Sequence, residues 1–176
     1  MGALSFPVVS GAAVVAGGDT TAKHEPGTVM DYRNSEQWSF VEYVQLDNNG
    51  CSQGIVLINN YATLKQFSVA QAASADQGCP IRGISVGTIA SQKFGWMYIG
   101  GYVEKAAISN TAASGEYLMV SGSATGQLTS DKASAFNTGS GTLGGDNSTS
   151  YMVVAVARTA IASAAIGSIS LVGVWG

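Results

Sequence analysis

The sequence predicts a mainly β protein, a small antiparallel β-barrel or sandwich with an extended N-terminal arm. Short runs of aromatic and β-branched residues alternate with Gly, Asn and Ser turn signals along most of the chain. The sequence has no segment with the hydrophobic period and capping residues of an amphipathic helix. A length of 176 residues suits one domain, or one domain plus an arm.

The arm is predicted to span residues 1–35, and the β-rich domain residues 36–176. Small residues alternate with Val at the start of the arm, and "GGDTTAKHEPGT" (17–28) follows without any hydrophobic period. Such a stretch has too little apolar surface to offset the entropy lost when it becomes ordered. We therefore expect the arm to become ordered by lying on a neighbouring subunit.

Three strand-like runs open the domain. "QWSFVEYVQL" (37–46) is rich in aromatic and β-branched residues, and "DNNG" (47–50) is a turn signal. "GIVLI" (54–58) indicates a short buried strand. The alternation in "TLKQFSVAQAA" (63–73) favours a strand but leaves a two-turn helix open. "SADQGCP" (74–80) is expected to be a loop.

A hairpin follows, with strands "IRGISVGTIA" (81–90) and "FGWMYIGGYV" (94–103) joined by the turn "ASQK". Large apolar side chains occupy both faces of the second strand, so both faces are expected to be covered. Alternation assigns the side chains as follows: Trp96, Tyr98 and Tyr102 on one face, and Met97, Ile99 and Val103 on the other.

The rest of the chain predicts three strands and one long loop. "EYLMVS" (116–121) is a strand between two Gly-containing turns. "LTSDKASAFNTGSGTLGGDNSTS" (128–150) is expected to be a polar loop. "YMVVAVARTAI" (151–161) and "IGSISLVGVWG" (166–176) are the last two strands.

One internal similarity supports this hairpin-built sheet. "TIASQKFGWMYIG" from Thr88 resembles "TAIASAAIGSISLVG" from Thr159. Each combines a strand, an Ile-Ala-Ser turn, and a return strand that begins near a Gly. Two copies are a weak basis for a duplication, but both indicate antiparallel hairpins.

The surface is poor in charge. Only 11% of residues are charged, against roughly 25% in a typical soluble domain, and 23 are Gly. Because a free monomer normally stays soluble by displaying mixed charge, much of this surface is expected to face other protein. Net charge is −3, and the basic residues form no cluster that would favour nucleic acid. They are Lys23, Arg33, Lys65, Arg82, Lys93, Lys105, Lys132 and Arg158.

Neither a membrane span nor a secretion signal is predicted. No apolar run reaches about 18 residues, and Arg158 interrupts the best candidate. A signal peptide needs a basic start, yet no Lys or Arg precedes Lys23. We therefore expect synthesis in the cytoplasm. Cys51 and Cys79 lack zinc-site spacing; they either pair or stay free, and two buried hydrophobes are favoured.

Two patterns resemble catalytic or cofactor motifs. "GISVG" (83–87) matches G-x-S-x-G, but a Ser85 nucleophile needs a following helix and a downstream histidine. His24, the sole histidine, lies upstream in the predicted arm. "GSGTLG" (139–144) matches G-x-G-x-x-G without the strand before it and the helix after it that a dinucleotide site requires. A strand and a polar loop are the favoured interpretations.

Metal and acid–base sites are not predicted either. One His and two distant Cys do not converge as metal ligands, and the Asp residues lack the spacing of a calcium loop. Glu104 and Glu116 are placed at strand ends as solvated residues. Asn147 is a glycosylation site only in a secreted eukaryotic chain. The sequence therefore predicts no catalytic residue, cofactor-binding residue or metal ligand.

Large aromatic side chains are the chain's most prominent feature. Some are expected in the core, and the scarcity of charge indicates that others form interfaces. The set is Trp38, Phe40, Tyr43, Phe94, Trp96, Tyr98, Tyr102, Tyr117, Tyr151 and Trp175.

Residues 81–175 resemble the head decoration (cement) proteins of tailed bacteriophages, especially those common in marine and cyanobacterial phages. The resemblance covers a little over half of the chain. It rests on the order of "FGWMYIGGYV", "AASGEYLMVSG" (112–122), a "TGQL" turn, a Thr/Ser/Asp loop, and "VAVARTA" before an apolar strand. A longer Gly/Ser tract (139–150) replaces the acidic loop usual in that family.

The resemblance implies a non-enzymatic, β-rich virion protein, commonly a homotrimer. It would sit on the outer surface of an icosahedral capsid, where it bridges major capsid protein subunits and contacts neither nucleic acid nor membrane. Its arm would lie across neighbouring subunits. Two alternatives stay open: another phage structural part, such as a tail or fibre subunit, and a serine hydrolase-like enzyme that uses Ser85.

Overall fold

The computed structural model contains strands and no helix within the part of the chain that it describes. That part comprises residues 8–10, 16–34, 37–47, 49–59, 68–73, 81–121, 124–130 and 154–172. The mainly β class is therefore confirmed. The strands are β1 (Val8–Ser10), β2 (Val29–Asn34), β3 (Gln37–Leu46), β4 (Val56–Asn59), β5 (Ser68–Gln71), β6 (Ile81–Ser85), β7 (Phe94–Ile108), β8 (Tyr117–Val120), β9 (Leu128–Ser130), β10 (Ala155–Ala157) and β11 (Ala165–Leu171).

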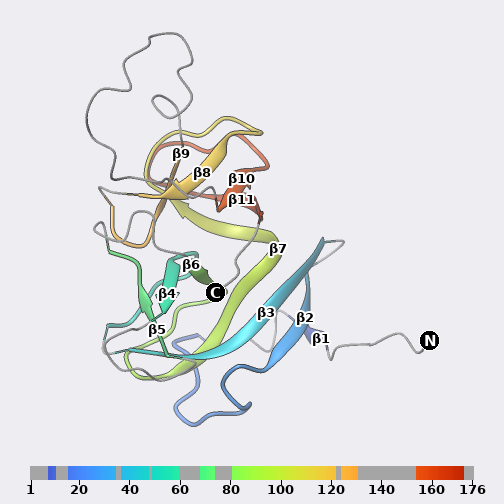
Figure 1. The fold of residues 1–176 in the computed structure, drawn as a ribbon, viewed down its shortest axis with the longest axis vertical. Coiled ribbons are helices and arrows are strands. Elements are labelled where there is room, and N and C mark those ends of the chain that lie inside the picture. Colours follow the sequence, from blue (N-terminus) through green and yellow to red (C-terminus); the bar gives the residue numbers. More distant parts are fainter. Residues whose placement is uncertain are drawn as a thin grey trace, which may run out of the picture.

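Five strands close into a first barrel, called barrel 1 here. Its ring runs β3, β5, β4, β6 and β7, and it closes because β7 pairs with β3. The β3–β5 pair is parallel, and the other four pairs are antiparallel. Barrel 1 is the lower half of the molecule in Figure 1.

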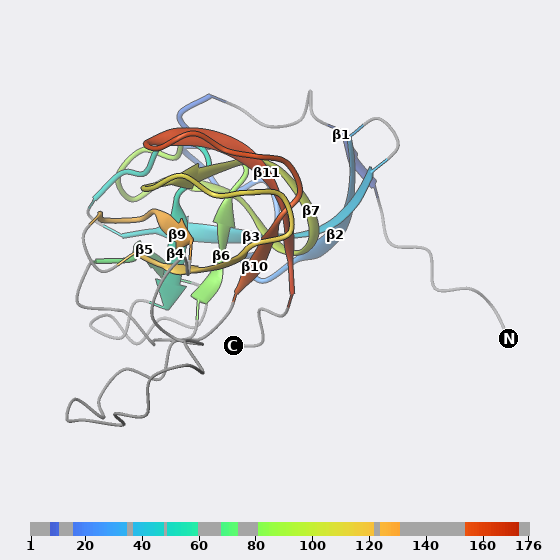
Figure 2. The same cartoon turned by 90° about the horizontal axis from the view of Figure 1, so that it is seen from above.

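A second ring, barrel 2, continues from the same long strand. It runs β7, β11, β10, β8 and β9, and it closes through one parallel pairing of Ile108 with Leu128. The 15-residue β7 thus serves both barrels: residues 94–101 pair with β3 and residues 101–108 with β11. Figure 1 shows β7 passing from the lower barrel to the upper one, and Figure 2 shows β1 and β2 beside the barrels.

The two barrels repeat one another in local geometry. The one parallel pair in the ring of barrel 1 (β3–β5) corresponds to the one parallel pair in the ring of barrel 2 (β7–β9). In each Ile-Ala-Ser turn the residue after Ser has a positive φ, 59° at Gln92 and 53° at Ala164. The internal similarity in the sequence therefore marks a duplication of a whole barrel, larger than the single hairpin it indicated.

The duplication extends to packing around the turns. A Cβ added to Gly95 would lie 2.7 Å from the Ile89 side chain, and one added to Gly167 would lie 2.4 Å from Ile161. Each isoleucine therefore occupies the space that the following glycine leaves open. Two equivalent backbone bridges tie the turns to their barrels: Cys51 with Ile89, and Ala112 with Ile161.

Each barrel has an apolar interior. The interior of barrel 1 is a cluster of seven buried residues: Val44, Leu46, Cys51, Leu57, Val69, Ile89 and Met97. The larger cluster fills barrel 2 with side chains such as Ile108, Leu118, Leu128 and Ile169. It continues between the barrels, where it includes Tyr43, Trp96 and Tyr98 from the outer face of barrel 1. The barrels are thus joined by a continuous core.

The predicted alternation along β7 holds up to Ile99 and then changes. Met97 lies inside barrel 1, whereas Trp96 and Tyr98 belong to the larger cluster, as predicted. Val103, however, joins the same cluster as Trp96. The cause is a β-bulge in which Ile99 is an extra residue between the pairs Tyr98–Val41 and Gly100–Phe40. Beyond this bulge the pairing places Tyr102 on the face of Trp38 and Val103 on the face of Trp96, so both were assigned to the wrong face.

The described residues before 35 contact the chain's own barrels. β2 pairs antiparallel with β3 along its whole length, and β1 pairs parallel with β2. Residue Asp19 bridges Phe94, and its carboxylate accepts a hydrogen bond from Tyr43 Oη at 2.8 Å. Residues 16–34 are thus part of the β domain. Tyr32 and Asp19 are buried there, against partners that the sequence pattern does not reveal.

Other expectations are refined or lie outside the described residues. The loop predicted from residue 128 begins with strand β9, which pairs with β8. The strand favoured over 63–73 is observed as β5, within the described part of that range. The segments 60–67, 74–80, 131–153 and 173–176 are outside the description, and with them Cys79, Tyr151, Trp175 and the 139–150 tract.

Candidate functional site

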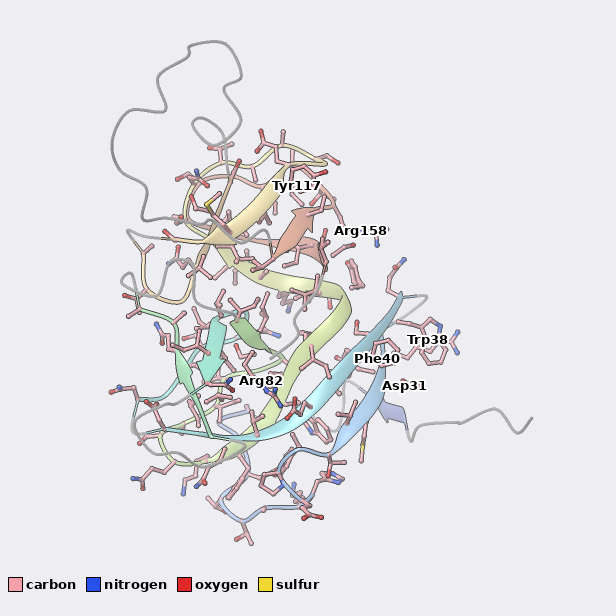
Figure 3. All side chains as sticks on the ribbon, in the orientation of Figure 1. Asp31, Trp38, Phe40, Arg82, Tyr117 and Arg158 are labelled. Atoms are coloured by element: carbon pink, nitrogen blue, oxygen red, sulfur yellow. The ribbon has the colours of Figure 1, made fainter. Side chains whose placement is uncertain are left out.

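An exposed aromatic surface lies where β2, β3 and β7 are side by side. Trp38 and Phe40 leave 52% and 49% of their surfaces exposed, although both stand on a regular strand. Figure 3 shows both side chains directed away from the body of the molecule, near Asp31. Together with Tyr102 and the arginines at 33 and 158, these two residues form what we call the aromatic face.

Barrel closure explains why these aromatics are exposed. Trp38 and Phe40 share a strand face with Val44 and Leu46, which point into barrel 1. The first residues of β3 extend beyond the ring of barrel 1. The strand face that points into the barrel at Val44 and Leu46 is therefore exposed at Trp38 and Phe40. A Cβ at Gly100 would lie 3.6 Å from the Phe40 ring, so the ring sits over backbone on β7.

Arginines cover the aromatic rings of this face. The Arg33 guanidinium carbon lies 5.1 Å from the centre of the Trp38 ring, and that of Arg158 lies 5.4 Å from the Tyr102 ring. Both distances suit cation–π contacts. Trp, Tyr and Arg are the residues most enriched at protein interfaces and among their energetic hot spots. The arrangement is therefore suited to bind another protein.

Ser85 is committed to a structural role in barrel 1. It is fully buried in β6, and its hydroxyl donates to the Ser52 carbonyl at 2.7 Å and accepts from Ile55 N–H at 2.9 Å. The duplication places Ala157 at the equivalent position of barrel 2. The Ser85 carbonyl accepts a hydrogen bond from Gly54 N–H, and the Ala157 carbonyl accepts one from Gly115 N–H. A strand position, as favoured from the sequence, is what the structure has.

His24 lies against aromatic rings of barrel 1. Its ring centre is 5.2 Å from that of Tyr43 and 5.1 Å from that of Trp96. Burial and the neighbouring Asp19 carboxylate raise the pKa of Tyr43 to about 12. Burial alone would raise the Asp19 pKa, but hydrogen bonds from Lys23 and Tyr43 outweigh it and hold that pKa below its usual value. This cluster fastens residues 16–28 to the barrel.

Sequence reasoning missed a buried ion pair at one end of barrel 1. Arg82 Nη2 lies 2.6 Å from Glu42 Oε1, and the two side chains are 20% and 5% exposed. Both residues have unremarkable neighbours in sequence, and strands β3 and β6 are distant along the chain. A charged residue inside the "QWSFVEYVQL" run was the only available signal.

A surface pocket of about 460 Å³ lies between the turns of barrel 1 and the 124–127 loop of barrel 2. Its described lining residues carry hydroxyl and amide groups and no charged side chain: Gly50, Cys51, Ser52, Ile55, Gln71, Thr88, Ile89, Ala90, Thr125 and Gln127. Burial raises the pKa of the Cys51 thiol, which therefore stays protonated at neutral pH. The described part of the pocket is thus polar but uncharged.

The remaining candidates do not converge on a site. Glu116 accepts from Ala113 N–H at 2.8 Å and from Ser130 Oγ at 2.5 Å, so it caps a turn. Glu104 is exposed on β7, whereas 139–144 and Asn147 lie outside the described residues. Within the described ranges no three His, Cys, Asp or Glu side chains group as metal ligands, and no helix could cross a membrane.

Comparison with known proteins adds no relative. No protein-family model matches the chain, and no curated protein matches it significantly.

Proposed function

We propose that this protein is a non-enzymatic structural subunit of a tailed-phage virion that binds the outer surface of the icosahedral capsid. It would stabilise the shell by bridging major capsid protein subunits, and it would self-associate as a homotrimer. The observation that carries the proposal is the aromatic face, with Trp38 and Phe40 half exposed on regular strands. Single exposed apolar residues are ordinary, whereas a cluster with arginines points to a protein partner.

Energetics favour attachment through this face. Covering the exposed half of a Trp or Phe side chain contributes about 1 kcal/mol, before the costs of association are subtracted. Repetition of one weak contact over a symmetric shell multiplies its effect. Attachment through an N-terminal arm is not proposed for residues 16–34, because these residues already contact the chain's own barrels.

The resemblance of residues 81–175 to head decoration proteins supplies the identity of the partner. Low charge and the predominance of strands are equally compatible with a tail or fibre subunit. The two buried hydrogen bonds of the Ser85 hydroxyl argue against the hydrolase alternative.

The direct test mixes the purified chain with undecorated phage heads and, in parallel, with isolated tails. We expect saturable binding to heads, seen by co-sedimentation and electron microscopy, and trimers in analytical ultracentrifugation. Binding to tails alone would assign the chain to the tail or fibre instead. Failure to bind either particle would contradict the proposal.

A further inference from the structure

The two barrels present the same backbone edge, and in barrel 1 this edge is covered by residues 17–19. Ala90 N–H donates to the Gly17 carbonyl at 2.9 Å. Asp19 and Phe94 exchange two hydrogen bonds, with N–H to carbonyl distances of 2.7 and 3.0 Å. The segment therefore adds two isolated backbone bridges beside the start of β7, and Gly17 and Gly18 within it have φ of 84° and 78°.

The duplication places Ala162 and Ile166 of barrel 2 where barrel 1 has Ala90 and Phe94. Ile166 pairs with Ala107, whose N–H points the other way and donates to Gly54 at 2.9 Å. Ile166 and Ala107 are thus a non-hydrogen-bonded pair, and the N–H and carbonyl of Ile166 point away from β7.

No described residue pairs with these outward groups of Ile166, nor with Ala162 N–H. The Ile166 side chain is 56% exposed beside them. An open strand edge with an exposed apolar side chain is a template for pairing with an extended chain.

We propose that the edge formed by residues 162–167 is a backbone-pairing site for a glycine-containing segment of a partner protein. The segment that covers the equivalent edge of barrel 1 indicates the chemistry of the occupant. A Cβ on Gly18 would lie 2.6 Å from the Phe94 carbonyl oxygen, so the occupant needs glycine at that position.

An acidic residue follows this glycine in the occupant. In barrel 1 the Asp19 carboxylate accepts from Tyr43. Counted back from the parallel pairings of Leu46 and Ile108, the position of Tyr43 corresponds to Lys105, which is exposed on β7. The occupant is thus a Gly-acidic segment whose glycine can adopt a positive φ, as Gly18 does. The proposal holds whether or not the chain decorates a capsid.

Hydrogen exchange of the full-length protein tests whether the site is open. We expect the Ile166 amide to exchange at least a hundredfold faster than that of Phe94. Equal protection in the monomer would mean that this chain covers its own edge. Protection that grows with protein concentration would mean that a second copy does. Either result would overturn the proposal.

A synthetic peptide of residues 14–23 then serves as the probe in an NMR titration. We expect shift changes at Ala162 and Ile166, and at least tenfold weaker binding when the peptide's glycine corresponding to Gly18 is replaced by valine. Ile166→Pro should abolish binding, because it removes the donor N–H.

Because Ile166→Pro could fail to fold, a second test reverses the charges of Lys105 and of the peptide's acidic residue. Lys105→Glu should weaken peptide binding at least threefold, and a peptide with lysine in place of Asp19 should restore it. Shift changes confined to Ile89 and Phe94, or none at millimolar peptide, would overturn the proposal.

Discussion

Gln92 and Ala164 hold the same left-handed backbone conformation at equivalent turns of the two barrels, with φ of 59° and 53°. Neither residue is glycine, so each turn keeps a conformation that L side chains rarely adopt. The positive φ is therefore kept at this position of both barrels although neither glutamine nor alanine favours it.

Ala164→Gly should stabilise the protein by up to about 1 kcal/mol, because glycine adopts positive φ without steric cost. Ala162→Gly in the same turn is the control, since its φ is not in the left-handed region. It should be neutral or destabilising, because glycine adds unfolded-state entropy. Urea unfolding measures both. A loss of stability with Ala164→Gly would contradict the role given to this turn.

Gly167→Ala should cost about 1–3 kcal/mol, because its Cβ would lie 2.4 Å from the Ile161 side chain. Gly100→Ala is the matched control on β7, where the added Cβ would make an ordinary contact at 3.6 Å with Phe40. Thermal or urea unfolding should separate the two variants. Equal losses of stability in the two variants would show that contact with Ile161 does not restrict the size of the residue at position 167.

Glu42→Gln should destabilise barrel 1 by about 2–3 kcal/mol, since it leaves Arg82 without a carboxylate in a largely buried place. The 20% exposure of Arg82 keeps the cost below that of a fully buried pair. Lys23→Gln, in an ion pair whose lysine is 60% exposed, should cost less than about 1 kcal/mol. The reverse order in urea unfolding would refute this ranking.

Asp19 should make stability depend on acid pH. Its folded-state pKa lies below the usual value, so its contribution is present above the unfolded pKa of about 4 and is lost as pH falls through the folded value. Asp19→Asn should therefore lower the melting temperature at pH 7 and flatten its fall between pH 4 and pH 2. An unaltered profile with Asp19→Asn would be inconsistent with the fastening of residues 16–28.

Local pattern was enough to predict several strands. The aromatic and β-branched run of β3 and the alternation in β7 up to Ile99 are short-range signals, so the sequence contains them in full. The Ile-Ala-Ser turns were visible for the same reason. Closure of two barrels was not visible, because it depends on pairings such as β3 with β7 between distant segments.

The aromatic face could not be predicted from the sequence either, because it depends on which strands lie side by side. Alternation in β3 puts apolar residues on both faces, and nothing local distinguishes buried Val41 from exposed Phe40. β2 was assigned to the arm because the residues before it, 17–28, have no hydrophobic period, although Asp31 and Arg33 alternate with apolar residues within β2. That alternation is typical of a strand with one solvated face, and the pairing with β3 was needed to recognise it.

Binding of Trp38→Ala/Phe40→Ala to undecorated phage heads tests the central claim most directly. Both side chains are half buried, so the variant should lose some stability but stay folded, which circular dichroism at the binding temperature verifies. Tyr117→Ala is the control, an aromatic residue 55% exposed on β8, outside the aromatic face. We expect the double variant to bind heads at least about tenfold more weakly than wild type, and Tyr117→Ala to bind normally. Wild-type affinity of the double variant for heads would contradict the account.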